Sequence, residues 1–285
     1  MQKKKRRFFY LFVFPGCLGI MVFVLLPFLD VVKRSFTTAV TGEFSGGKNY
    51  EAIFQNQAFL LAVKNTVRFT LICIPVLVAL GLGTALLLSG LKKGRLLKAV
   101  YLLPLAMPTA TVALVWKLVF YKQGFFNLFL TRLGLLTGLW GEVHREYLGT
   151  AAAFWVLVGS YIWKNMGYTV VLWLAGLSGI SGEMLEAARV DGAGSWQRFW
   201  RITLPNLKGS LYTIVILSFL NSFKIYREAY LTAGAYPDQS IYLLQHLFNN
   251  WFVNLELDKM AAAAVCTGGV LMSAILALQR LWENG

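Results

Sequence analysis

The feature that most constrains this chain is a series of six long apolar segments. They cover residues 8–29, 67–89, 99–120, 150–177, 205–226 and 259–282. Each is long enough to cross the hydrocarbon core of a bilayer, which takes about 20 helical residues. Because backbone groups inside lipid must bond within their own segment, each segment is expected to be a helix. Prolines remove an amide donor and predict kinks or helix ends at Pro15, Pro75, Pro104 and Pro108. We therefore predict an all-α integral membrane protein with six transmembrane helices.

The composition agrees with a membrane protein. Hydrophobic residues make up 57% of the 285 residues and charged residues only 14%, whereas a soluble domain carries about a quarter charged residues. The net charge of +14 comes from short clusters between apolar segments, which is typical of topology determinants and not of a nucleic-acid interface. The first apolar segment exceeds the roughly 7–15 residues of a signal-peptide core. No cleavage site follows it, so we expect it to be retained as a helix.

The positions of lysine and arginine predict the orientation of the chain. Basic clusters lie in residues 1–7, 90–98 and 178–204. The positive-inside rule places these three segments, and with six spans both termini, in the cytoplasm. The remaining connections, 30–66, 121–149 and 227–258, then lie outside. The predicted organisation is a basic N-terminus with the first helix (1–30), an external loop (31–66) and a core of five transmembrane helices (67–282) with the cytoplasmic loop 178–204.

The cytoplasmic loop 178–204 begins with a short helical pattern. The run "EMLEAARV" gives about two turns and is followed by Asp191 and Gly192. A glycine at this place can adopt the left-handed conformation that ends a helix. Ala187 and Ala188 leave a smooth face on which another surface could pack closely.

The second half of this loop has the pattern of a helix at the membrane surface. Trp196, Phe199, Trp200 and Thr203 recur at helical spacing, and the arginines lie elsewhere on the helix. Aromatic residues near the acyl boundary and arginines near the head groups are typical of interfacial helices.

The spacing within this loop resembles a known motif. Glu186-Ala187-Ala188, three residues, Gly192, nine residues and then Ile202-x-Leu204-Pro205 is similar to the EAA loop of ABC importer permeases. The segments "WKNMGYTVVLWLAGLSGIS" and "DGAGSWQRFWRITLPNL" resemble the carbohydrate-uptake branch of that family. The early segment "FYLFVFPGCLGIMVFVLLPF" resembles the half of that branch related to the larger permease subunit of the maltose importer, whose large external insert is absent here.

The resemblance implies a type I ABC importer permease fold with a cytoplasmic EAA coupling helix. In that family the helix docks on an ATPase subunit, a role that carries over to Glu186, Ala187, Ala188, Asp191 and Gly192. The implied partners are a second, homologous permease, two ATPase subunits, an extracellular or periplasmic solute-binding protein and membrane lipid. The implied location is the cytoplasmic membrane of a bacterium or archaeon.

ATP chemistry is expected on a separate subunit. It requires a phosphate-binding loop such as GxxxxGK[ST], and this sequence contains none. We therefore expect ATP and Mg on the partner ATPase, and neither a bound cofactor nor enzymatic activity on this chain.

Polar residues inside predicted spans are candidates for the substrate path. These are Lys164, Asn165, Ser218, Asn221, Ser222 and Phe223, and the resemblance places part of a sugar site near Asn221 and Phe223. Lys164 could instead pair between helices, and serine and asparagine also join transmembrane helices. Lys224 and Glu228, spaced i, i+4, could pair with each other.

The predicted function is the transmembrane permease of a sugar or oligosaccharide importer that works by alternating access. A permease for glycerol phosphate or another polyol is the alternative. A stand-alone secondary transporter is disfavoured because the sequence has few carboxylates within its spans and shows no inverted repeat. A membrane enzyme is disfavoured because no metal-ligand cluster or nucleophile–base pair is evident in a span.

Overall fold

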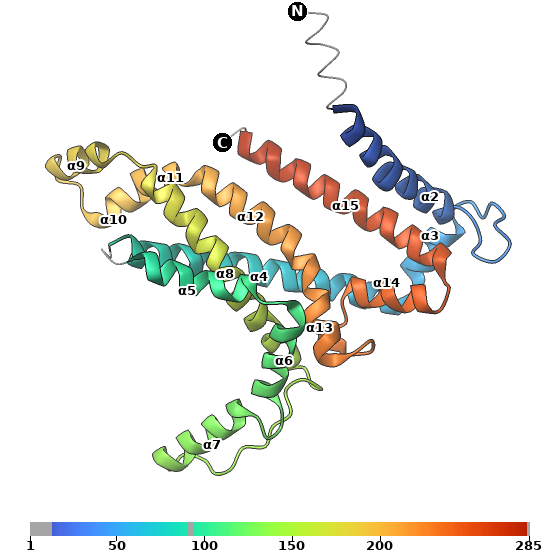
Figure 1. Ribbon diagram of the computed structural model, residues 1–285, viewed down its shortest axis with the longest axis horizontal. Coiled ribbons are helices and arrows are strands. Elements are labelled where there is room, and N and C mark those ends of the chain that lie inside the picture. The colour runs from blue at the N-terminus through green and yellow to red at the C-terminus, as the bar shows by residue number, and fades with distance from the viewer. Residues whose placement is uncertain (1–12, 91–93, 284–285) are drawn as a thin grey trace, which may run out of the picture. The chain divides into compact units, whose positions relative to one another are not determined.

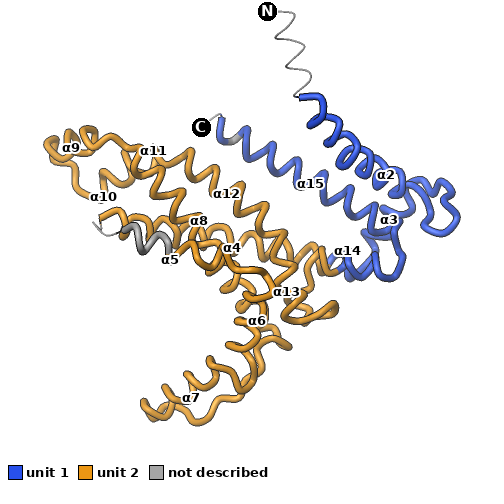
Figure 2. The backbone as a smooth tube through the Cα atoms, viewed as in Figure 1, with its two compact units in different colours: residues 1–60, 247–285 blue, residues 61–246 orange. Residues whose placement is uncertain are grey.

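The computed structural model describes residues 13–90 and 94–283, and it is helical almost throughout. The basic residues of the N-terminus, together with Lys92 and Lys93, lie outside the described residues. The chain forms two compact units (Figure 2): unit 1 comprises residues 1–60 and 247–285, and unit 2 comprises residues 61–246. Within the described ranges the only β pairing is an isolated bridge between Thr37 and Phe44.

Unit 1 is built on two long helices that pack along each other (Figure 1). The first is the helix Val13–Ser35, which contains the π-helical turn η1 (Met21–Leu25) and α2 (Leu26–Ser35). The second is α15 (Leu257–Glu283), which also contacts the short helix α3 (Lys48–Gln55). Most side chains of the first helix are exposed and apolar, as expected for a helix surrounded by lipid.

Unit 2 contains the remaining helices. In chain order they are α4 (Gln57–Ser89), α5 (Gly94–Ala106), α6 (Thr109–Phe120), α7 (Phe125–Thr137), α8 (Ala153–Ser178), α9 (Gly182–Val190), α10 (Ser195–Arg198), η2 (Phe199–Thr203), α11 (Leu204–Asn206), α12 (Lys208–Ser222), η3 (Phe223–Ile225), α13 (Tyr226–Ala233), η4 (Gln239–Ile241) and α14 (Leu244–Val253). The first residues of α4 (57–60) and most of α14 (247–253) belong to unit 1.

Helix α8 forms the centre of unit 2, because it packs against α5, α6 and α12. Tyr161 and Trp173, on different turns of α8, are almost completely buried in two apolar clusters. The indole Nε1 of Trp173 donates a hydrogen bond to the carbonyl of Val78 on α4 (3.2 Å). These contacts fix the helix that carries Lys164 and Asn165.

The helices agree with six membrane spans. Three helices are long and apolar enough to cross a membrane, and three bent helix pairs raise the number to six if each pair is one span. The bends are 107° between Val100–Ala106 and Thr109–Thr137, 65° after Ser178 and 63° after Asn206. Pro108 lies at the first of these breaks, whereas Pro75 and Pro104 lie inside continuous helices.

Two helices extend well beyond the apolar segments predicted for them. The helix predicted at 67–89 begins ten residues earlier, at Gln57, and the helix predicted at 8–29 continues to Ser35. An apolar window marks only the part of a helix that lies in hydrocarbon. Polar residues such as Lys64 and Asn65 therefore lie outside the apolar window, although they belong to the same helix.

Candidate functional site

The short helix predicted at the start of the loop 178–204 is present as α9. It follows Ser181, which has extended backbone angles, and it ends at Asp191. Gly192 then adopts a φ of +82°, and its amide donates to the carbonyl of Arg189 (3.1 Å) while that of Ala193 donates to Ala188 (2.9 Å). The predicted helix end at Gly192 is thus confirmed, because glycine takes this left-handed conformation without the strain that a Cβ introduces.

Helix α9 presents nearly all of its surface to the outside of the chain. All of its nine residues are described, and none of them is buried. Glu186 and Ala187 are exposed and Ala188 is half-buried, while Val190 is 87% exposed. Figure 1 shows α9 at the end of unit 2 away from α13. A helix of this kind is available to a partner.

The aromatic residues that follow α9 form one cluster. The ring centroids of Trp196 and Phe199 lie 5.6 Å from that of Trp200, and they lie 6.3 Å from each other. Trp196 is 74% exposed and Trp200 is 50% exposed. Exposed tryptophans next to a transmembrane helix favour the boundary between lipid and water.

The serines predicted for the substrate path lie at contacts between helices. Ser218 is fully buried; its hydroxyl shares a hydrogen bond with the Tyr168 hydroxyl (2.8 Å), and its carbonyl accepts from the Tyr161 hydroxyl (2.6 Å). The Ser222 hydroxyl shares a hydrogen bond with that of Thr70 on α4 (3.1 Å). These bonds join α12 to α8 and α4.

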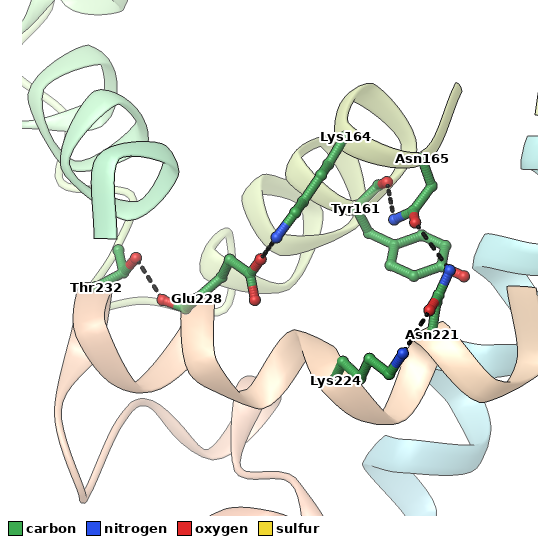
Figure 3. Close-up of polar contacts among 7 residues, drawn as sticks. All are labelled: Tyr161, Lys164, Asn165, Asn221, Lys224, Glu228 and Thr232. Atoms are coloured by element: carbon green, nitrogen blue, oxygen red, sulfur yellow. Dashed lines mark hydrogen bonds and ion pairs between the residues drawn. The ribbon is translucent and has the colours of Figure 1, made fainter. Parts of the chain in front are cut away.

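Asn165 and Asn221, from segments far apart in sequence, are brought together (Figure 3). The side-chain amide of Asn221 donates to Asn165 Oδ1 (3.4 Å), and Lys224 Nζ donates to Asn221 Oδ1 (3.2 Å). Asn165 also donates to the carbonyl of Tyr161 (2.8 Å). Asn165 is buried, Asn221 half-buried and Lys224 exposed, so this polar chain runs from the interior of unit 2 to its surface.

Lys164 pairs with Glu228, so the expected pairing of Lys224 with Glu228 is wrong. Lys164 Nζ contacts Glu228 Oε1 between α8 and α13 (Figure 3), and the side chains are 19% and 5% exposed. Lys224 lies in the tighter 3₁₀ turn η3, whereas Glu228 lies in α13, so regular i, i+4 geometry is not maintained between them. Glu228 was not predicted as a site residue. The sequence could have pointed to Glu228, because it is a carboxylate close to an apolar span, and such a carboxylate requires a cationic partner.

Phe223 packs edge-on against Phe219, with ring centroids 5.5 Å apart. It also lines a pocket of about 10 Å³ together with Thr66, Ser222 and Leu244. This volume is at most that of one water molecule. Unit 2 alone therefore does not enclose a sugar at Phe223.

The fold and these residues define a class of protein: a multi-pass helical membrane protein with a short exposed helix, α9, on one connection and paired polar residues between its helices. The sequence profile of the binding-protein-dependent transport system inner membrane components matches residues 76–283. The chain belongs to this family.

Curated relatives and a solved structure agree with the family. The trehalose/maltose transport system permease protein MalF of Thermococcus litoralis is 31% identical over 280 residues, which cover 96% of this chain and 92% of the relative. The arabinooligosaccharides transport system permease protein AraP of Bacillus subtilis is 32% identical over 232 residues, covering 78% and 71%. A chain of a bacterial alginate ABC transporter, solved in complex with an alginate pentasaccharide-bound periplasmic protein, superposes with a TM-score of 0.79 at 19% identity, covering 98% and 94%. The predicted fold, that of an ABC importer permease, is confirmed.

Proposed function

We propose that this chain is one of two homologous permease subunits that together form the translocation path of an ATP-driven importer for a sugar or oligosaccharide. The observation that carries the proposal is the family match over residues 76–283, which includes α9 and the polar residues of α8 and α12. The names of the relatives, trehalose/maltose and arabino-oligosaccharide permeases, support a saccharide substrate.

Coupling to ATP hydrolysis is assigned to Glu186, Ala187, Ala188, Asp191 and Gly192. Helix α9 is exposed and ends at a fixed left-handed glycine, so it can insert into a groove of a partner as a rigid element. Two ATPase subunits bind ATP and Mg and move this helix when they close. The spans joined to it then tilt and switch access from the outside to the cytoplasm.

The orientation follows from this assignment. The loop 178–204 and both termini face the cytoplasm, and the opposite face receives substrate from a solute-binding protein. The solved complex of a similar permease with a periplasmic protein supports such a partner. The membrane is the cytoplasmic membrane of a bacterium or archaeon.

The substrate path is assigned to the polar residues between α8 and α12–α13. Amide and hydroxyl groups match sugar hydroxyls, and the chain from Asn165 through Asn221 reaches the exposed Lys224. A second permease subunit completes the cavity beside Asn221 and Phe223. Ser218 and Ser222 support this surface through their bonds to α8 and α4, and Lys164 supports it through Glu228.

The test compares Gly192→Asp with Gly194→Asp in the assembled importer. Both glycines are exposed in the same loop, and a Cβ at either would meet no atom within 4 Å. Gly192 has a φ of +82°, whereas Gly194 has a φ of −62° at the N-cap of α10, where aspartate is favourable. We expect Gly192→Asp to abolish uptake and substrate-stimulated ATP hydrolysis, and Gly194→Asp to retain both.

Retention of the ATPase and the transported substrate are measured in parallel. If the purified chain never retains an ATPase subunit and Gly192→Asp imports normally, the coupling assignment is wrong. Uptake of labelled oligosaccharides is compared with uptake of glycerol phosphate. Import of the phosphorylated polyol alone would contradict the saccharide assignment and leave the coupling assignment standing.

A further inference from the structure

A small pocket lies beside the Lys164–Glu228 pair in unit 2. It has a volume of about 20 Å³ and is formed mainly by α6, α8 and α13. Its polar lining residues are Trp116, Ser160, Glu228 and Thr232, and the others are apolar. One water molecule needs roughly 10–15 Å³, so the pocket has room for a water molecule.

Two polar atoms of these lining residues need a partner. Trp116 Nε1 and Ser160 Oγ are buried, and neither forms a hydrogen bond with any residue that the structure describes. Leaving such a buried group unsatisfied costs about 1–3 kcal/mol. The Trp116 ring is fixed between Phe120 and Trp163, at centroid distances of 5.6 and 5.9 Å, so its N–H direction is also fixed.

Glu228 supplies an acceptor at the same place. Its side chain is 5% exposed, and Lys164 contacts one oxygen, Oε1. A buried ion pair is stable only when further hydrogen bonds satisfy its remaining lone pairs. The Thr232 hydroxyl donates to the backbone carbonyl of Glu228 (2.7 Å) and is therefore already engaged.

The chemistry of these groups selects the ligand. The indole N–H of Trp116 only donates and repels a cation, whereas the carboxylate of Glu228 only accepts and repels an anion. The Ser160 hydroxyl can do either. A neutral molecule that both donates and accepts, and that fits in about 20 Å³, satisfies all three.

We propose that one water molecule binds in this pocket. It accepts a hydrogen bond from Trp116 Nε1, donates one to the Glu228 carboxylate and forms a third with Ser160 Oγ. The water thereby connects α6, α8 and α13 and donates a hydrogen bond to the Glu228 carboxylate beside Lys164. This inference does not depend on the transported substrate.

The direct test is a structure of the assembled importer in lipid at a resolution that shows ordered water. We expect one water peak within hydrogen-bonding distance of Trp116 Nε1, Ser160 Oγ and a carboxylate oxygen of Glu228. A map that shows other buried waters but none here overturns the proposal. A direct hydrogen bond between Trp116 and Ser160 also overturns it.

A double-mutant cycle on the same complex gives a second measurement. Trp116→Phe removes the indole N–H and Ser160→Ala removes the hydroxyl. If both groups bind the same water, the double variant lowers the thermal inactivation temperature by less than the sum of the two single variants. The matched control is Trp155→Phe, since Trp155 is a 59% exposed residue of α8 that does not line the pocket. Its effect should add to that of Ser160→Ala, and additive effects for Trp116→Phe as well would contradict a shared water.

Discussion

Gly167 is expected to set the distance between α5 and α8. A Cβ at this position would contact the carbonyl oxygen of Tyr101 and would lie 2.8 Å from its carbonyl carbon and 3.0 Å from Leu102 Cα, where ordinary contacts measure 3.4–4 Å. These atoms belong to the backbone of α5, so no side-chain rotation relieves the clash. In Gly167→Ala the two helices must separate by about 0.5–1 Å.

The magnitude follows from a comparison with Gly159→Ala. Gly159 lies on the same helix, and a Cβ there would meet no atom within 4 Å. Both changes gain the same helix propensity, about 1 kcal/mol, so the difference between the variants isolates the overpacking cost. That cost is typically about 1–3 kcal/mol, which corresponds to a difference of roughly 2–12 °C in unfolding temperature.

The measurement is the thermal inactivation temperature of each purified importer complex, taken at one heating rate because unfolding of such complexes is usually irreversible. We expect Gly167→Ala to inactivate at the lower temperature and Gly159→Ala to match or exceed the wild type. If the two variants inactivate at the same temperature, the close approach of α5 to Gly167 does not exist in the assembled protein.

Two further predictions concern charged groups. Glu228→Ala leaves the mostly buried Lys164 without its partner and should lower the free energy of unfolding by on the order of 3 kcal/mol. Lys224→Ala removes an exposed ammonium and should lower it by under about 1 kcal/mol. Equal decreases in the thermal inactivation temperature of the two variants would contradict the pairing of Lys164 with Glu228. Burial lowers the pKa of His246, which lies outside the spans, from 6.5 to about 4. Between about pH 6.5 and 4 the imidazole of His246 is therefore protonated in the unfolded chain but neutral in the folded chain. The free energy of unfolding falls by up to about 3 kcal/mol as the pH is lowered through this range. Unfolding temperatures across this range should fall more for the wild type than for His246→Gln, and parallel curves would show that His246 is not buried.

The apolar segments predicted where the long apolar helices lie, because each segment must satisfy its backbone within one helix. They did not predict how the helices bend. Pro75, Pro104 and Pro108 carry the same local signal, yet the chain breaks only at Pro108. In α4 and α5 the surrounding packing keeps the helix continuous across the missing hydrogen bond.

The candidate site was predictable to different extents. The end of α9 at Gly192 follows from local chemistry, because a helix terminator needs only its own backbone geometry. The contact of Lys164 with Glu228 joins residues 64 positions apart, and it depends on how α8 and α13 pack. No local pattern encodes such packing. The sequence does predict that a carboxylate buried beside an apolar span needs a partner, but it does not predict which residue that partner is.

The exposure of α9 has a consequence for mutational tolerance. Its nine described residues contribute no buried side chain to their own chain, so substitutions there should scarcely change how much of the subunit folds and inserts. Their effect should appear only after assembly, as a loss of transport at normal protein levels. In a mutational scan that measures abundance and uptake separately, α9 should therefore be the segment where the two quantities diverge most.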